Sequence, residues 1–136
     1  MNAPAAPAVH VLLVDDNAIN LLVAREMLLS LGVQVDSAED GERALTLLSE
    51  RHYALVFMDV MMPVLDGLEA TRALRQREAQ TGIPRTPVIA LTANTLHGDR
   101  AVCLDAGMDD YLPKPVRVED LARMLARWLP VGSWRR

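Results

Sequence analysis

The chain has 136 residues, of which 51% are hydrophobic and 24% are charged. A chain of this length and composition is expected to fold as one globular domain rather than to remain disordered. The formal net charge of −4 disfavours a module that binds nucleic acid directly, because such modules usually carry a basic surface. The single cysteine, Cys103, excludes an internal disulfide and favours a reducing, cytoplasmic setting with a buried structural thiol.

The two ends of the chain have the composition of flanking segments. Residues 1–8 are rich in alanine and proline and are predicted to be a linker, and residues 131–136 are predicted to be a short, loose tail. The folded domain is expected to span residues 9–130. No apolar run reaches the length of about 18 residues that a membrane-spanning helix needs, so we expect no membrane insertion by this segment.

Five short apolar runs are predicted to form strands. They lie at residues 10–14, 33–37, 54–58, 87–91 and 111–112. The first, third and fourth runs consist almost entirely of Val, Leu, Ile and Ala, which is typical of strands buried on both faces of a parallel sheet. The second run alternates apolar and polar residues, which favours an edge strand with one side facing water.

Helix signals separate the first three of these runs. Val23, Met27 and Leu31 recur every four residues, which predicts a helix with these side chains on one face. Asp40 precedes the next helical segment and is placed to cap it, because an aspartate side chain can accept the unpaired N–H groups of the first turn.

Three more helices are predicted in the second half of the chain. Residues 66–80 and 94–106 form two of them, and Gly107 is placed to end the second in a C-cap role. An apolar stripe at helical spacing marks the last, formed by Val118, Leu121, Ala122, Leu125 and Leu129. Five strand–helix repeats in succession predict an α/β domain with a parallel sheet covered on both faces. Ligands of such sheets bind beyond the carboxyl ends of the strands.

Polar residues follow the predicted strands at these carboxyl ends. Asp15 and Asp16 come after the first strand, Asp59 after the third, Thr92 after the fourth and Lys114 after the fifth. Two carboxylates about 4 Å apart repel each other by about 4 kcal/mol at an effective dielectric constant of about 20, so the site must hold a proton or a cation. Oxygen ligands with access to water favour Mg²⁺. The set suits phosphoryl transfer onto Asp59, with an aspartyl phosphate as the product.

Lys114 is the one lysine among the 14 lysine and arginine residues of the chain. An ammonium group is a compact point charge, whereas a guanidinium group is a broad planar fork. The use of lysine at this position therefore indicates a narrow site that needs a single cation. We also predict that the Lys114–Pro115 peptide bond is cis.

Four segments together resemble the receiver domain of two-component response regulators. They are VLLVDDN at 11–17, MDVMMPVLDG at 58–67, ALTAN at 90–94 and YLPKP at 111–115. Each segment alone is a weak signal, but their order and spacing match the family over most of the chain. The resemblance implies a doubly wound (βα)5 fold of the flavodoxin or CheY-like kind, with five parallel strands in the order 2-1-3-4-5.

The resemblance also implies a role for each polar residue at the sheet edge. Asp59 would be the phospho-acceptor, and Lys114 and Thr92 would contact the phosphoryl group. The ligands of Mg²⁺ (or Mn²⁺) would be the side chains of Asp16 and Asp59, the backbone carbonyl of Met61 and, through water, Asp15. The Met61 side chain departs from those regulators that carry a polar residue at this position, and it either shields the acyl phosphate from water or only packs.

A switch and a set of partners follow from the same resemblance. Thr92 would move toward the phosphoryl group and Tyr111 would turn inward, which changes a surface within residues 94–128 that partners read. The partners would be the dimerisation and phosphotransfer domain of a histidine kinase and a histidine phosphotransfer protein, with the domain itself a monomer or weak dimer. Three longer segments are similar to the receivers attached to hybrid sensor histidine kinases: DDNAINLLVAREML, DGLEATRALR and ALTANTLHGDRAVCLDAGMDDYLPKPV. This similarity implies that the domain lies in the cytoplasm, either free or as the cytoplasmic part of a membrane-bound kinase.

Two alternatives remain beside a receiver within a hybrid kinase. A stand-alone single-domain response regulator would use the same site. A metal-dependent phosphatase with an aspartate nucleophile is disfavoured, because such enzymes typically carry a second carboxylate two residues further on, where this chain has Met61. A receiver catalyses its own phosphorylation and slow dephosphorylation without being a turnover enzyme, although the parent chain would be a kinase.

Overall fold

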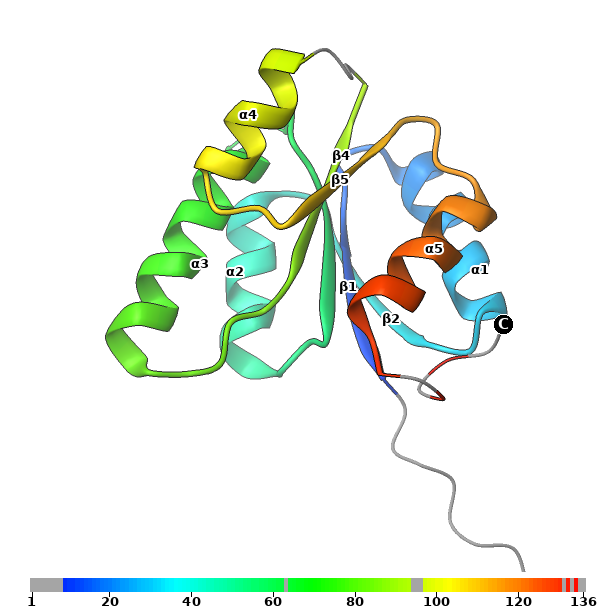
Figure 1. Cartoon of the computed structure of the whole chain (residues 1–136), viewed down its shortest axis with the longest axis horizontal. Helices are drawn as coiled ribbons and strands as arrows, with labels where there is room; N and C mark the ends of the chain where they lie inside the picture. The colour runs from blue at the N-terminus through cyan, green and yellow to red at the C-terminus, as the bar shows by residue number, and fades with distance from the viewer. Residues whose placement is uncertain (1–8, 63, 94–96, 131, 133, 135–136) are drawn as a thin grey trace, which may run out of the picture.

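The computed structural model describes residues 9–130 other than 63 and 94–96, together with residues 132 and 134. In that part of the chain strands and helices alternate as β1 (His10–Val14), α1 (Ala18–Ser30), β2 (Gln34–Ala38), α2 (Gly41–Glu50), β3 (Leu55–Asp59), α3 (Gly67–Thr81), β4 (Val88–Thr92), α4 (His97–Asp105), β5 (Asp110–Pro113) and α5 (Val118–Trp128). The strands form one parallel sheet in the order β2-β1-β3-β4-β5, which confirms the predicted fold. Helices α1 and α5 cover one face of the sheet, and α2, α3 and α4 cover the other (Figure 1).

The protein has two hydrophobic core clusters, one on each face of the sheet, and the strands contribute side chains to both. All five residues of β3 and of β4 are buried, as expected for strands covered on both faces. Along β3 the side chains alternate, so that Phe57 packs toward α1 and α5 while Val56 and Met58 pack toward the other helices. In β2, Val35 is buried and Gln34 is exposed, which confirms that this strand has a wet side at the sheet edge.

Helix α1 forms where predicted, but the predicted face is buried only in part: Leu31, just beyond the helix, is buried and Met27 packs against the core. Its buried side chains are Leu21, Ala24 and Leu28, whereas Val23 is 47% exposed. The segment is apolar on almost every side, so a recurrence every four residues cannot decide which stripe turns inward. As a result, apolar side chains of α1 are left facing solvent.

Helix ends follow the predicted capping chemistry. The side chain of Asp40 accepts a hydrogen bond from the Arg43 N–H at 2.8 Å at the start of α2. Gly107 has a φ of +103° just beyond α4, a backbone conformation that glycine adopts without a steric penalty. The predicted helix over 94–106 is observed over His97–Asp105, and residues 94–96 lie outside the described residues.

Several predictions about the periphery are also tested. Cys103 is buried in the core cluster beneath α2, α3 and α4, as expected of a structural thiol. Trp134 is half-buried and packs against the core cluster beneath α1 and α5, so the tail is not loose at this residue. The predicted linker, residues 1–8, lies outside the described residues. In the described part of the chain, no helix is long and apolar enough to cross a membrane.

Candidate functional site

Three carboxylates meet at the carboxyl edge of the sheet. Asp15 follows β1, where its N–H donates to the Ala38 carbonyl, and Asp59 is the last residue of β3. One carboxylate oxygen from each of Asp15, Asp16 and Asp59 lies within 4.8 Å of the other two. Asp15 and Asp59 are buried and Asp16 is exposed, so the cluster is accessible to water on one side.

Lys114 reaches into this cluster from the end of β5. Its Nζ lies 2.9 Å from Oδ2 of Asp59 and 3.2 Å from Oδ2 of Asp15. The Lys114 N–H donates to the Thr92 carbonyl at 2.8 Å, which ties the base of the side chain to the end of β4. The Lys114–Pro115 peptide bond is cis, as predicted. The one lysine of the sequence is therefore the cation that pairs with both buried carboxylates.

The local environment shifts the pKa values of both partners. Burial raises the pKa of Asp59 above its usual value, the hydrogen bond and charge of Lys114 offset this only in part, and the charge of Asp15 adds to it. Burial alone would lower the pKa of Lys114, but its hydrogen bond to Asp59 and the charges of Asp59 and Asp15 raise it. The lysine is thus held charged, while the carboxylate cluster still favours additional positive charge.

The loop after β3 contacts the carboxylate of Asp59. The Met61 N–H donates to Oδ1 of Asp59 at 3.2 Å, and the Met61 side chain is 77% exposed. Met62, by contrast, packs against the core cluster beneath α2, α3 and α4. Simple packing therefore explains Met62 and does not explain Met61. At Gly67 a Cβ atom would overlap the Asp59 carbonyl oxygen, so glycine is needed for α3 to start this close to the site.

Val64 adopts a backbone conformation that a β-branched residue rarely takes. Its φ is +70° and its side chain is exposed, so nothing gained by burial offsets the steric cost. We expect Val64→Gly to raise the free energy of unfolding by roughly 1 kcal/mol in urea titrations. The matched control is Ile83→Gly in the exposed α3–β4 loop, which has no positive φ and should lose stability.

The predicted switch residues lie on neighbouring strands. Thr92 is the buried last residue of β4, at the same sheet edge as the carboxylates. Tyr111 of β5 is half-buried, packs against the core cluster on the α4 side and lies outside the carboxylate cluster. The guanidinium of Arg100 in α4 lies over the Tyr111 ring, 5.5 Å from its centroid. The geometry thus groups the acids with Lys114, and places Tyr111 next to α4.

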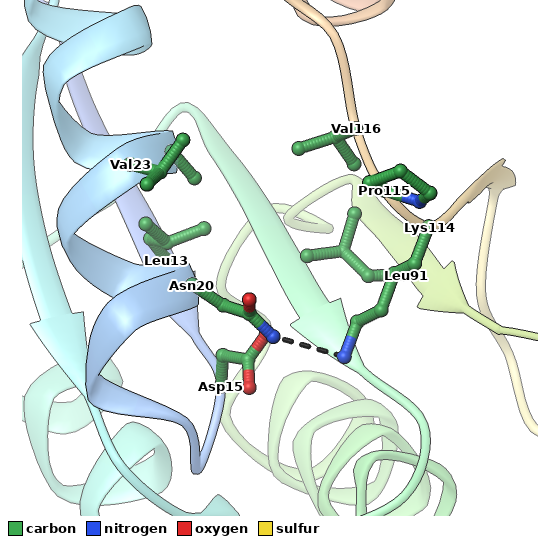
Figure 2. Close-up of a pocket in the computed structure, with 9 residues that line it drawn as sticks. Leu13, Asp15, Asn20, Val23, Leu91, Lys114, Pro115 and Val116 are labelled. Atoms are coloured by element: carbon green, nitrogen blue, oxygen red, sulfur yellow. Dashed lines mark ion pairs between the residues drawn. The ribbon is translucent and has the colours of Figure 1, made fainter.

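An apolar pocket of about 420 Å³, which sequence analysis missed, opens beside the Lys114–Asp15 ion pair. Figure 2 shows Val23 of α1 on one side, Pro115 and Val116 opposite and the ion pair at one end. The exposed side chains of Ile19 and Leu22 extend this apolar surface along α1. The sequence feature that could have revealed this surface is the high apolar content of α1. When one apolar face of such a helix is buried, another is left exposed.

Among curated proteins, the chain is 37% identical over 126 residues to the hybrid signal transduction histidine kinase L of Dictyostelium discoideum. The match covers 90% of this chain and 7% of that kinase. The chain therefore spans only a small part of the curated relatives that it matches.

The chain also matches solved structures of receiver domains and a family model. The receiver domain of Ssk1 in its complex with the histidine phosphotransfer protein Ypd1 of Saccharomyces cerevisiae has a TM-score of 0.86 and 32% identity, covering 92% of this chain and 91% of that one. The magnesium-bound receiver domain of sensor histidine kinase PA1611 from Pseudomonas aeruginosa PAO1 has a TM-score of 0.79 and 46% identity, covering 89% and 97%. The model of the response regulator receiver domain matches residues 11–126. With that match and this site geometry, the chain belongs to the response regulator receiver domain family.

Proposed function

We propose that this receiver domain accepts a phosphoryl group from a phosphohistidine onto Asp59 as a step of a two-component phosphorelay. The observation that supports this most directly is the position of Asp59 at the end of β3. Its carboxylate is buried, accepts the Met61 N–H and pairs with Lys114 beside two further carboxylates. A nucleophile with a cation and an acidic cluster around it is the set that phosphoryl transfer needs.

The donor set fits a hard divalent cation such as Mg²⁺ or Mn²⁺. It consists of carboxylate oxygens, and the exposed Asp16 leaves room for the water ligands that Mg²⁺ retains. We propose that Asp16, Asp59 and the Met61 carbonyl would hold the ion directly and Asp15 through water. When bound, it would neutralise charge on the phosphoryl oxygens. The magnesium described in the PA1611 receiver domain supports this assignment.

The residues of the chain itself define the covalent step. A carboxylate oxygen of Asp59 attacks phosphorus, an O–P bond forms, and the N–P bond of the phosphohistidine breaks with its electron pair returning to the imidazole nitrogen. Lys114, which is held charged by its neighbours, would then pair with a phosphoryl oxygen. Thr92 at the end of β4 would bind another phosphoryl oxygen, and its displacement together with Tyr111 would form the switch.

The apolar surface on α1 is where we propose that the phosphodonor docks. It joins the pocket beside Lys114, so a partner that covers it would bring a histidine close to Asp59. The donor would be the dimerisation and phosphotransfer domain of a histidine kinase or a histidine phosphotransfer protein, as in the Ypd1 complex of the related Ssk1 domain. We propose that residues 9–130 form the receiver of a cytoplasmic hybrid kinase, with a stand-alone regulator as the alternative.

The proposed function is tested with the full chain and a small-molecule phosphodonor. With Mg²⁺ we expect each chain to gain one phosphoryl group as an acyl phosphate that hydroxylamine removes, read by intact-mass spectrometry. Adding a chelator should reduce uptake to the background, because the acidic cluster then lacks its cation. Sustained release of many phosphates per chain would instead support the phosphatase alternative, and no uptake at all would contradict the proposal.

A further inference from the structure

A half-buried arginine joins three elements at the end of the sheet opposite the carboxylates. Arg75, in the middle of α3, donates from Nε to the Gly107 carbonyl at 2.9 Å. One Nη donates to Oε1 of Glu78 and to the Thr86 carbonyl, and the other donates to Oδ2 of Asp109, each at 2.8 Å. The side chain is only 14% exposed. A single guanidinium thus holds α3, the α3–β4 loop and the α4–β5 turn together.

The acceptors of Arg75 are held in turn by other groups. Oδ2 of Asp109 also accepts the Val88 N–H at 2.8 Å, and the Asp109 N–H donates to the Val88 carbonyl at 2.8 Å. Arg85 donates to Oδ1 of Asp109 from Nε and Nη. A Cβ atom at Gly107 would lie 2.8 Å from Cγ of Arg75, so the stem of the arginine packs directly on the turn. The turn is therefore fixed both by packing and by charge-assisted hydrogen bonds.

Over residues 100–105, helix α4 buries fewer of its side chains than the turn that follows it. Within residues 100–105 only Cys103 is buried, and Val102 faces solvent. Just after the helix, Ala106 and Met108 are buried. In Figure 1 the helix runs from the side of the carboxyl end of β4 back toward the start of β5. Its described side chains thus pack sparsely until the point where Arg75 holds the chain.

We propose that Arg75 is a positioning residue that pins the C-terminal end of α4, so that α4 pivots near Gly107 when Asp59 is phosphorylated. This inference rests on the proposed function, because it needs a phosphoryl group at Asp59. Thr92 and the first turn of α4 lie at the end of the sheet that carries Asp59. The turn that Arg75 holds, after α4, lies toward the opposite end. A helix fixed at one end converts a small displacement at the other into a tilt of its whole exposed face.

The geometry of the network requires an arginine at position 75. Its acceptors are two carbonyl oxygens and two carboxylates, which lie around one planar guanidinium fork. An ammonium group at the same place keeps the charge but cannot reach all four. Arg75→Lys therefore loosens the pin while it leaves the net charge unchanged. Arg72→Lys is the matched control, since Arg72 lies exposed on the same helix and outside the network.

The test is amide hydrogen exchange on the full chain, with and without beryllofluoride and Mg²⁺ as the phosphoryl mimic. In the parent and in Arg72→Lys, we expect the mimic to change exchange in α4 while residues 106–110 stay protected in both states. In Arg75→Lys, residues 106–110 should exchange at least about tenfold faster, and the response of α4 to the mimic should be lost. Phosphoryl uptake at Asp59 should stay within about twofold of the parent, which a general loss of structure would not allow.

Each outcome decides the inference. If Arg75→Lys keeps the parental response of α4, or if residues 106–110 respond together with α4 in the parent, the pivot is wrong and the proposed function stands. If the parent binds no beryllofluoride, both fail together. Should Arg75→Lys not fold, Asp109→Asn takes its place, because it preserves the side-chain shape and removes the charge that Arg75 binds.

Discussion

Asp59→Asn is expected to take up no phosphoryl group from a small-molecule donor in the presence of Mg²⁺. An amide oxygen is a far weaker nucleophile than a carboxylate, and the other two carboxylates of the cluster do not accept the Met61 N–H that orients Asp59. We expect uptake to fall by at least about a thousandfold, to the limit of detection in intact-mass spectrometry.

The matched control for this substitution lies in the same loop. Asp66 caps α3 by accepting the Glu69 N–H at 2.9 Å, and asparagine caps helices as well as aspartate does. Asp66→Asn should therefore keep both its stability and its phosphoryl uptake. Parental uptake by Asp59→Asn would mean that another residue is the acceptor, and the assignment of the site would be wrong.

The raised pKa of Asp59 gives the same substitution a second, thermodynamic signature. A carboxyl group whose pKa is higher in the folded state binds its proton more tightly there, so its ionisation near pH 7 costs stability. As the pH falls through the raised pKa, the metal-free parent should regain that stability. Asp59→Asn should lack this gain. Because Lys114 still pairs with Asp15 in this variant, it should also be no less stable than the parent near pH 7, measured by urea unfolding in chelator at about pH 7, 6 and 5. An identical pH dependence in both proteins would contradict the raised pKa.

The strands that carry the site were predictable because burial on both faces leaves an unmistakable apolar run. The predicted limits of β3 and β4 were nevertheless one residue too early. The pairing of the backbone continues past the apolar run, with Asp59 opposite Leu91 and Thr92 opposite Pro113. The apolar run ends at the first polar side chain, whereas the hydrogen bonding between the strands continues through that residue. Strand pairing thus fixes the backbone of Asp59 and Thr92, while their side chains project at the end of the sheet.

Two features could not be derived from the sequence for physical reasons. The orientation of α1 depends on which of its apolar faces fits the sheet, and periodicity carries no information when most faces are apolar. The Arg75 network joins residues up to 34 positions apart, and neither spacing nor composition marks Arg75 among the other arginines. Such contacts become visible only when the tertiary structure brings α3 and the α4–β5 turn together.

Lys114→Met is expected to produce the largest loss of stability in the metal-free protein. It removes the ammonium that pairs with two buried carboxylates, and breaking a buried pair from one side typically costs about 3–5 kcal/mol. The lysine side chain is 22% exposed, so we expect a loss of about 2–3 kcal/mol. The raised pKa of Lys114 means that this contribution is complete at neutral pH and is lost only as the pH rises through that raised value.

Lys114 has two proposed roles, which are to stabilise the buried carboxylates and to pair with the phosphoryl group. Mg²⁺ and a charge-conserving variant separate them. A divalent cation can replace the missing charge, so Mg²⁺ should raise the unfolding free energy of Lys114→Met by more than that of the parent. Lys114→Arg keeps the charge and should lose less stability. Its guanidinium does not fit a position where Nζ lies 2.9 Å and 3.2 Å from two carboxylates, so the response of α4 to beryllofluoride should be lost. If Lys114→Arg responds like the parent, any cation suffices, and the presence of the one lysine at this position has no chemical meaning.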